Sequence, residues 1–230
     1  MTAKIVSFSG IDGAGKSTQI SALETWLRET GHTTRLLTFW DDIVVGSRFR
    51  EAMSHAAFKG DEGVGSPEKP LERRDKNVTS WPVIAARFFL YFADAINLCR
   101  TVVQARRSNF DVVIFDRYIY DELANLPLKR WPARAFIWAM LKIVPKPDVA
   151  YIVDADPEAA RARKPEYPLE FLRSNREAYL SLARFSRNIA VIEPLSIDAA
   201  KIRIQQEFLR AQPDAKEGST GPDFCSETAK

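Results

Sequence analysis

Residues 10–18 hold the side chains and glycines best suited to chemistry, reading Gly-Ile-Asp-Gly-Ala-Gly-Lys-Ser-Thr. The segment fits the pattern G-x-x-x-x-G-K-[ST] and directly follows a short apolar run. Glycines let a backbone fold around a phosphate with its N–H groups pointing inward, and the start of a helix adds partial positive charge there. The lysine can reach the β- and γ-phosphates, and the serine hydroxyl suits Mg²⁺. This segment, called the P-loop below, therefore predicts a nucleoside triphosphate site.

The predicted triphosphate-binding residues are Gly10, Asp12, Gly13, Ala14, Gly15, Lys16, Ser17 and Thr18. The structural alternative is a glycine-rich turn capped by serine. A dinucleotide-binding loop fits less well, because the glycines are spaced G-x-x-G-x-G rather than G-x-G-x-x-G. A GTPase switch is disfavoured because the sequence contains no Asn-Lys-x-Asp tetrapeptide.

A second candidate group, Asp116 and Arg117, follows the apolar run 111–115. If that run is a strand beside the first one, its carboxyl end places Asp116 near the metal ion. Arg117 suits a second anion, such as the phosphate of an acceptor substrate. Asp116 could instead cap a helix, and both roles could hold together.

Three cations, Arg161, Arg163 and Lys164, follow the apolar run 149–153, and Pro165 and Pro168 then interrupt the helical pattern. A basic, hinge-like segment could close over a bound triphosphate and neutralise charge developing on its γ-phosphoryl group. We therefore predict a lid at residues 161–168. The alternative is a solvated helix end that carries cations at its negative terminus.

Short apolar runs alternate with helical patterns along the chain, which is typical of a parallel sheet covered by helices on both faces. The expected strands are 5–9, 35–38, 111–115, 149–153 and 188–192. The expected helices are 16–29, 83–106, 132–143, 169–186 and 197–210. We predict one α/β domain over residues 1–210, with an insertion at 59–80 and a disordered tail at 211–230.

Composition excludes several classes of protein. The chain has 230 residues, a formal net charge of +3, two cysteines and two histidines. This charge is too small to indicate a nucleic-acid or membrane partner, and the cysteines cannot form a disulfide framework. The longest apolar stretch, 81–98, contains Arg87 and Asp94, so it indicates a core helix rather than a membrane span. We expect a cytoplasmic protein.

Over residues 4–210 the chain resembles the thymidylate kinase family of P-loop nucleoside-monophosphate kinases. The resemblance is carried by Phe8–Gln19, Asp116-Arg117-Tyr118, Asp154–Glu158 and Arg176–Leu182. It implies a P-loop NTPase fold with a five-stranded parallel sheet in the order 2-3-1-4-5, and a lid. It also implies Mg·ATP as phosphoryl donor, a small-molecule nucleotide as acceptor and a homodimer as a possible assembly.

The resemblance also implies roles for individual residues. Asp12 would approach the sugar hydroxyl of the acceptor, Arg117 would grip its phosphate and Tyr91 would stack on its base. Arg163 would lie against adenine. The P-loop has no arginine, so the basic lid would have to stabilise the transferring group. The predicted catalytic residues are thus Lys16, Arg117, Arg161, Arg163 and Lys164, the acceptor residues Asp12, Tyr91, Asp116 and Arg117, and the metal ligands Ser17 and Asp116.

Departures from the family pattern fall on the acceptor side. Residues 39–44 replace an Arg-Glu-Pro-Gly-Gly-Thr loop, Ala95 replaces a base-reading arginine, and 124–127 replaces Ala-Tyr-Gln-Gly. Asn97 and Asn125 are candidate replacement readers, or simply polar surface residues. The expected reaction is dTMP + ATP to dTDP + ADP. The alternatives are a deoxynucleoside kinase, a kinase of another small hydroxyl or phosphate acceptor, and a non-catalytic nucleotide-binding module.

Overall fold

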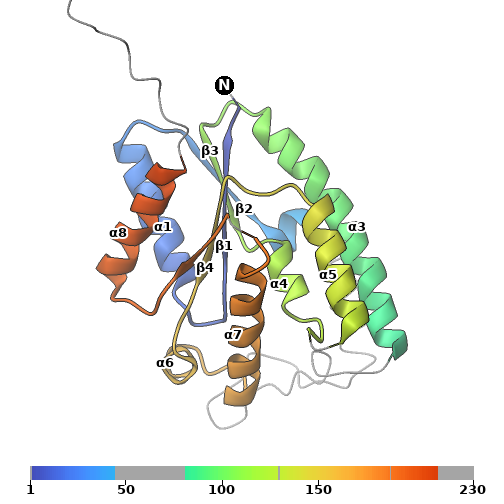
Figure 1. The fold of residues 1–230 in the computed structure, drawn as a ribbon. Coiled ribbons are helices and arrows are strands. Elements are labelled where there is room, and N and C mark those ends of the chain that lie inside the picture. The colour runs from blue at the N-terminus through green and yellow to red at the C-terminus, as the bar shows by residue number, and fades with distance from the viewer. Residues whose placement is uncertain (1, 45–80, 129, 187, 212–230) are drawn as a thin grey trace, which may run out of the picture.

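The structure, a computed structural model, describes residues 2–44, 81–128, 130–186 and 188–211. The predicted insertion at 59–80 and the predicted tail beyond residue 211 lie outside these residues, and element labels follow Figure 1.

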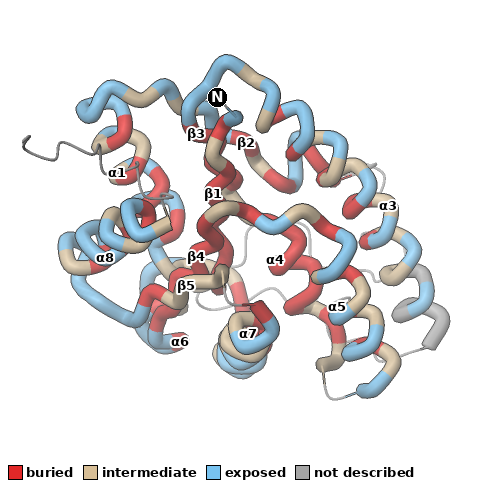
Figure 2. Tube along the Cα trace, turned by 45° about the horizontal axis from the view of Figure 1, so that its top comes forward, coloured by how far each residue is buried: buried red, intermediate tan, exposed pale blue. Residues whose placement is uncertain are grey.

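Five parallel strands form one sheet in the order β2-β3-β1-β4-β5, which confirms the predicted fold class. The strands are β1 (Lys4–Ser9), β2 (Thr34–Thr38), β3 (Val112–Asp116), β4 (Val149–Val153) and β5 (Ile189–Ile192). Their bounds differ from the expected ones by at most one residue. The central strands are buried along their length, as Figure 2 shows, because helices cover both faces of the sheet.

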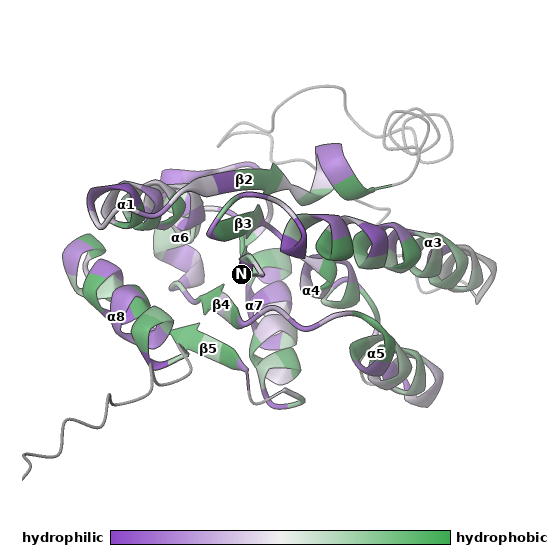
Figure 3. Cartoon of the chain, turned by 90° about the horizontal axis from the view of Figure 1, so that it is seen from above, coloured by the Kyte–Doolittle hydropathy of each residue, from purple (hydrophilic) through white to green (hydrophobic). Residues whose placement is uncertain are grey.

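Helices α1 (Lys16–Glu29) and α8 (Ile197–Arg210) cover one face of the sheet (Figure 3). The other face is covered by α3 (Trp81–Arg106), α4 (Ile119–Leu123), α5 (Trp131–Ile143) and α7 (Leu169–Ala183). Successive residues of β3 pack alternately into the two apolar clusters, since side chains of a strand point to opposite faces. Helix α7 ends at Ala183, before the expected residue 186.

Three short elements lie at the carboxyl edge of the sheet. They are α4, the helix α6 (Pro157–Arg163) and a π-helical turn, η1 (Phe39–Ile43). The P-loop follows β1, Asp116 ends β3 and α6 follows β4, and these three strands are neighbours. Because the carboxyl ends of parallel strands meet at one edge, the predicted site residues come from adjacent loops. None of the described helices combines the length and the apolar character needed to cross a membrane.

Candidate active site

The P-loop turns sharply at glycines whose φ is positive. Gly10 has a φ of +142°, and a Cβ there would lie 2.4 Å from the carbonyl oxygen of Val153 on β4. Gly15, the residue that caps α1, has a φ of +90° and open space where a Cβ would lie. Glycines therefore permit both the approach of the loop to the sheet and its opening at the start of α1.

Lys16 is 7% exposed, and its Nζ donates hydrogen bonds of 2.9 Å to the carbonyl oxygens of Gly10 and Ile11. The pKa of Lys16 is lowered to about 8, chiefly by burial and also by the charge of Arg117, while the nearby carboxylates of Asp12, Asp121 and Asp116 partly oppose the shift. The ammonium thus lies inside the loop that would bind the phosphates, and it titrates close to neutral pH.

The affinity for ATP is expected to fall as the pH rises through about 8, because neutral Lys16 no longer attracts the triphosphate. The loss approaches tenfold per pH unit above that value when bound nucleotide keeps the lysine protonated. Titration calorimetry with a non-hydrolysable ATP analogue between about pH 7 and 9.5 measures it. In the Lys16→Ala variant the residual affinity should not vary over this range. If the affinity of the wild type for the analogue also did not change with pH over this range, the prediction would be contradicted.

Arg117 has a left-handed backbone, with a φ of +72°, and its N–H donates to the carbonyl oxygen of Phe8 at 2.8 Å. This conformation costs a non-glycine residue about 1–2 kcal/mol. The guanidinium donates to Asp121 at 2.8 Å and to Asp12 of the P-loop at 2.5 Å. Burial opposes the charge, but Asp121 and Asp12 raise the pKa of Arg117 above its ordinary value. The charged side chain that was predicted to grip the acceptor therefore faces the P-loop.

Asp116 lies half-buried at the carboxyl end of β3. Burial raises the pKa of its carboxyl group, against the opposing effect of Arg117 and Lys16. The N-cap of the following helix, α4, is Tyr118 and not Asp116, so the helix-cap alternative for Asp116 is wrong.

The two residues predicted to hold Mg²⁺ offer oxygen donors on neighbouring elements. Ser17 is exposed in the first turn of α1, and Asp116 ends the strand paired with β1. No group of three or more His, Cys, Asp and Glu among the described residues could hold a metal ion by itself. A hydroxyl, a carboxylate and phosphate oxygens fit Mg²⁺, which usually keeps several waters and binds one or two protein carboxylates together with substrate phosphates.

Of the predicted lid cations, Arg163 lies at the P-loop. Its Nε donates to the carbonyl oxygen of Gly13 at 2.9 Å from the last turn of α6. Arg161 is half-buried on the same helix, whereas Lys164 pairs with Glu166 at 3.3 Å in the connection to α7. Only Arg163 of the three therefore has a hydrogen bond to the P-loop in this structure.

The contact between the P-loop and α6 predicts that Gly13→Ala is more damaging than Gly15→Ala. Both glycines have a positive φ, but a Cβ at Gly13 would lie 2.3 Å from the backbone oxygen of Ala160, whereas none is near at Gly15. We expect Gly13→Ala to lower the free energy of unfolding by about 3 kcal/mol and Gly15→Ala by about 1 kcal/mol. Urea unfolding of the two variants measures the difference, and equal losses would contradict the steric argument.

Two carboxylates that were not among the predicted site residues organise the site. Asp154, at the end of β4, accepts two hydrogen bonds from Arg176 of α7, at 2.6 and 2.7 Å. Asp121, on α4, accepts hydrogen bonds from Arg117 and from Tyr179 of α7, both at 2.8 Å. The i, i+4 spacing of Arg117 and Asp121 was a usable signal, but it does not reveal the contact with α7.

The residues that the sequence suggested for the acceptor's base are buried or hydrogen-bonded to the backbone. Tyr91 is 8% exposed within the larger apolar cluster. Asn97 donates to the carbonyl oxygen of Ile43 at 2.7 Å and Asn125 to that of Asp121 at 2.8 Å. Both amides thus support the backbone in this structure, which favours a structural role over base reading.

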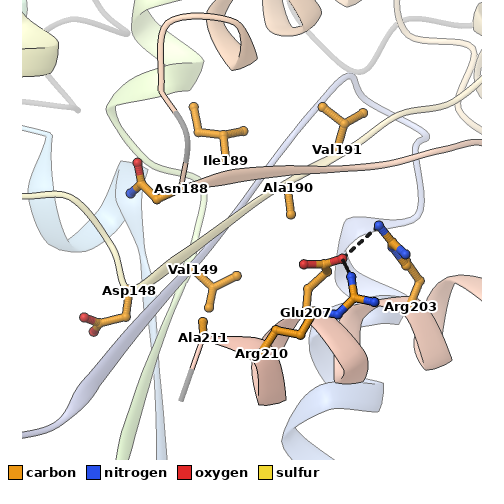
Figure 4. Close-up of a pocket in the computed structure, with 10 residues that line it drawn as sticks. All are labelled: Asp148, Val149, Asn188, Ile189, Ala190, Val191, Arg203, Glu207, Arg210 and Ala211. Carbon is orange, nitrogen blue, oxygen red and sulfur yellow. Dashed lines mark hydrogen bonds and ion pairs between the residues drawn. The ribbon is translucent and has the colours of Figure 1, made fainter. Parts of the chain in front are cut away.

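A separate cavity of about 330 Å³ lies between β5 and α8, away from the P-loop (Figure 4). Glu207 accepts from Arg203 at 2.8 Å and from Arg210 at 2.9 Å. With Asp148 also in its wall, the cavity is lined by two cations and two carboxylates. Unlike the P-loop, it offers no excess of positive charge for a phosphate group.

The sheet order, the P-loop after β1 and the arginine after β3 define a P-loop α/β nucleotide-binding protein. A family model described as thymidylate kinase matches residues 76–204. A probable thymidylate kinase from Pyrobaculum aerophilum is 32% identical over 194 residues, covering 77% of this chain and 82% of that protein. The chain belongs to the thymidylate kinase family, and it is thus a nucleotide phosphotransferase.

Other similarities agree. A probable thymidylate kinase from Methanosphaera stadtmanae is 26% identical over 192 residues, covering 82% of this chain and 88% of that protein. The crystal structure of thymidylate kinase from Ehrlichia chaffeensis superposes with a TM-score of 0.59 at 17% identity, over 91% of this chain and 99% of that one. The structure of thymidylate kinase from Candida albicans gives 0.62 at 18% identity, over 91% and 93%. At such identities the two structures support the fold.

Proposed function

We propose that this protein transfers the γ-phosphoryl group of Mg·ATP to thymidylate, giving dTDP and ADP. Family membership supports the donor and the type of reaction. The observation that carries the proposal is the contact of Arg117 with Asp12, because a cation held beside the P-loop is suited to bind the phosphate of an acceptor. A protein that only bound ATP would have no need for that second cation.

Catalysis of this kind is mostly positioning and electrostatic stabilisation. The P-loop amides and Lys16 would hold the β- and γ-phosphates, and Arg117 would hold the acceptor's phosphate in line with them. Arg163, with Arg161 and Lys164, would shield the transferring group from water. Ser17 and Asp116 would hold Mg²⁺, which when bound neutralises charge on the phosphate oxygens.

Asp12 binds Arg117 in this structure, and its carboxylate would also accept a hydrogen bond from the sugar hydroxyl of the acceptor. Tyr91 would support the base from the larger apolar cluster. Both assignments follow the family pattern.

A panel of acceptors tests the proposal, with the mass of each product as the readout. Thymidylate should be the best acceptor among nucleoside monophosphates, thymidine and sugars. Transfer to thymidine or to a sugar, but not to thymidylate, would replace the proposal with a nucleoside or hydroxyl-compound kinase. ATP binding with no transfer to any acceptor would indicate a binding module.

We also propose that the protein acts in the cytoplasm as a homodimer. Exposed apolar side chains on the outer sides of α3 and α5 support self-association, notably Phe89, which is 74% exposed, and Trp131, which is 79% exposed. Light scattering during gel filtration measures the assembly directly, and the mass of a single chain would exclude a stable dimer.

A further inference from the structure

The carboxylate of Asp121 is buried and fully hydrogen-bonded. Its side chain is 1% exposed, and Oδ2 accepts from the Ser9 hydroxyl at 2.6 Å and from the Tyr118 N–H at 3.2 Å. Oδ1 accepts from the Tyr179 hydroxyl and from Arg117, both at 2.8 Å. A buried carboxylate is tolerated only with such partners. Because it is inaccessible, this group cannot touch a substrate and must act through its neighbours.

Of these neighbours, Arg117 belongs to the proposed reaction. One terminal nitrogen of its guanidinium donates to Asp121 and the other donates to Asp12. These two hydrogen bonds fix the orientation of the guanidinium plane. The backbone N–H of Arg117 is held by Phe8 at 2.8 Å, so the base of the side chain is fixed as well. A guanidinium has five N–H groups, and three remain for the acceptor's phosphate.

Tyr179 of α7 donates to the same oxygen of Asp121 that binds Arg117. Burial, followed by the charge of Asp121, raises the pKa of Tyr179 well above its ordinary value, so its hydroxyl keeps its proton and remains a donor. Arg176, one turn earlier on α7, binds Asp154, so the helix is held at two points beside the site. The orientation of Arg117 therefore depends on a helix that directly follows the predicted lid.

We propose that Asp121 is a positioning residue for the acceptor: together with Tyr179 it orients the guanidinium of Arg117 to receive the acceptor's phosphate. The proposal rests on the proposed function, since it assigns to Arg117 the phosphate of the phosphoryl acceptor. A carboxylate that only stabilised the fold would affect unfolding but not acceptor recognition, and this difference can be measured.

Asp121→Asn removes the charge while keeping the shape of the side chain. We expect the KM for thymidylate to rise about 10- to 100-fold, since hydrogen bonds to charged groups have effects of this size. Measured at about pH 6.5, where Lys16 stays protonated, the KM for ATP should stay within about twofold, because Asp121 makes no hydrogen bond to Lys16 and acts on it only through its charge. Steady-state kinetics with each substrate varied in turn separates the two constants.

Tyr179→Phe is the less disruptive variant, because it removes one hydrogen-bond donor to Asp121 and leaves the carboxylate itself in place. It should raise the KM for thymidylate about 3- to 10-fold. The matched control is Ser9→Ala, which removes a donor from Oδ2, the oxygen that does not bind Arg117. We expect this control to lower the unfolding temperature but to leave the KM for thymidylate within about twofold.

The outcomes separate the two proposals. If the wild type does not phosphorylate thymidylate, the proposed function fails first. The positioning role is overturned if the wild type is active and if the Tyr179→Phe and Asp121→Asn variants, both shown to be folded, have the same KM for thymidylate as the wild type. Should Asp121→Asn not fold, Tyr179→Phe alone decides, and an acceptor KM no higher than in Ser9→Ala overturns the role.

Discussion

Replacing Lys16 with alanine is expected to reduce phosphoryl transfer by roughly a thousandfold or more. The ammonium is the buried cation of the P-loop, bound to two backbone carbonyl oxygens of the loop itself. A triphosphate would take over these hydrogen bonds, and charge developing on the transferring group would strengthen them. Alanine supplies neither the donors nor the charge.

The fold of the Lys16→Ala variant should remain intact, because the loop is shaped by its glycines and by its packing against β4 and α6. Single-turnover measurement of ADP and product formation gives the loss of activity, and thermal unfolding tests the fold. Lys201→Ala, which alters an exposed lysine on α8, is the matched control and should behave as wild type. Turnover of the Lys16→Ala variant near that of the wild type would rule out the proposed mechanism.

Arg117→Lys is expected to lower kcat/KM for the acceptor about 100- to 1,000-fold while leaving ATP binding within a few-fold. The substitution keeps the charge but removes the fork that binds Asp12 and Asp121 together. A lysine ammonium cannot hold both carboxylates and a phosphate in one plane, so the acceptor would lose its alignment.

Kinetics with the acceptor varied and calorimetry with an ATP analogue measure the two effects of Arg117→Lys separately. Arg107→Lys, on the exposed residue that follows α3, is the control for the exchange itself. Acceptor kinetics unchanged in Arg117→Lys would show that this arginine does not hold the phosphate.

The features that are local in sequence could be predicted. The P-loop is a contiguous pattern, and the buried strands are continuous apolar runs, so both were identified with nearly correct bounds. Arg117 was found because it directly follows a strand. The short helix α4 escaped prediction, because five residues are too few to show a helical period.

The partners of the site residues could not be predicted. Tyr179 meets Asp121 across 58 residues of sequence, and Arg176 meets Asp154 across 22. Such contacts depend on the packing of α7 against the sheet, which no local pattern encodes. For the same reason Asn97 resembled a substrate reader in the sequence, whereas in the structure its amide binds the carbonyl of Ile43, 54 residues away. Asn125 binds the carbonyl of Asp121, only four residues earlier, so its contact is local and could have been considered from the sequence.

The ion pair between Asp12 and Arg117 has a thermodynamic consequence. One partner belongs to the loop proposed for the donor nucleotide, and the other is the residue proposed for the acceptor. A displacement of Asp12 when a triphosphate enters would change the field around Arg117, so the two nucleotides would not bind independently. Linkage then requires reciprocity: the factor by which ATP alters the dissociation constant of thymidylate equals the factor by which thymidylate alters that of ATP.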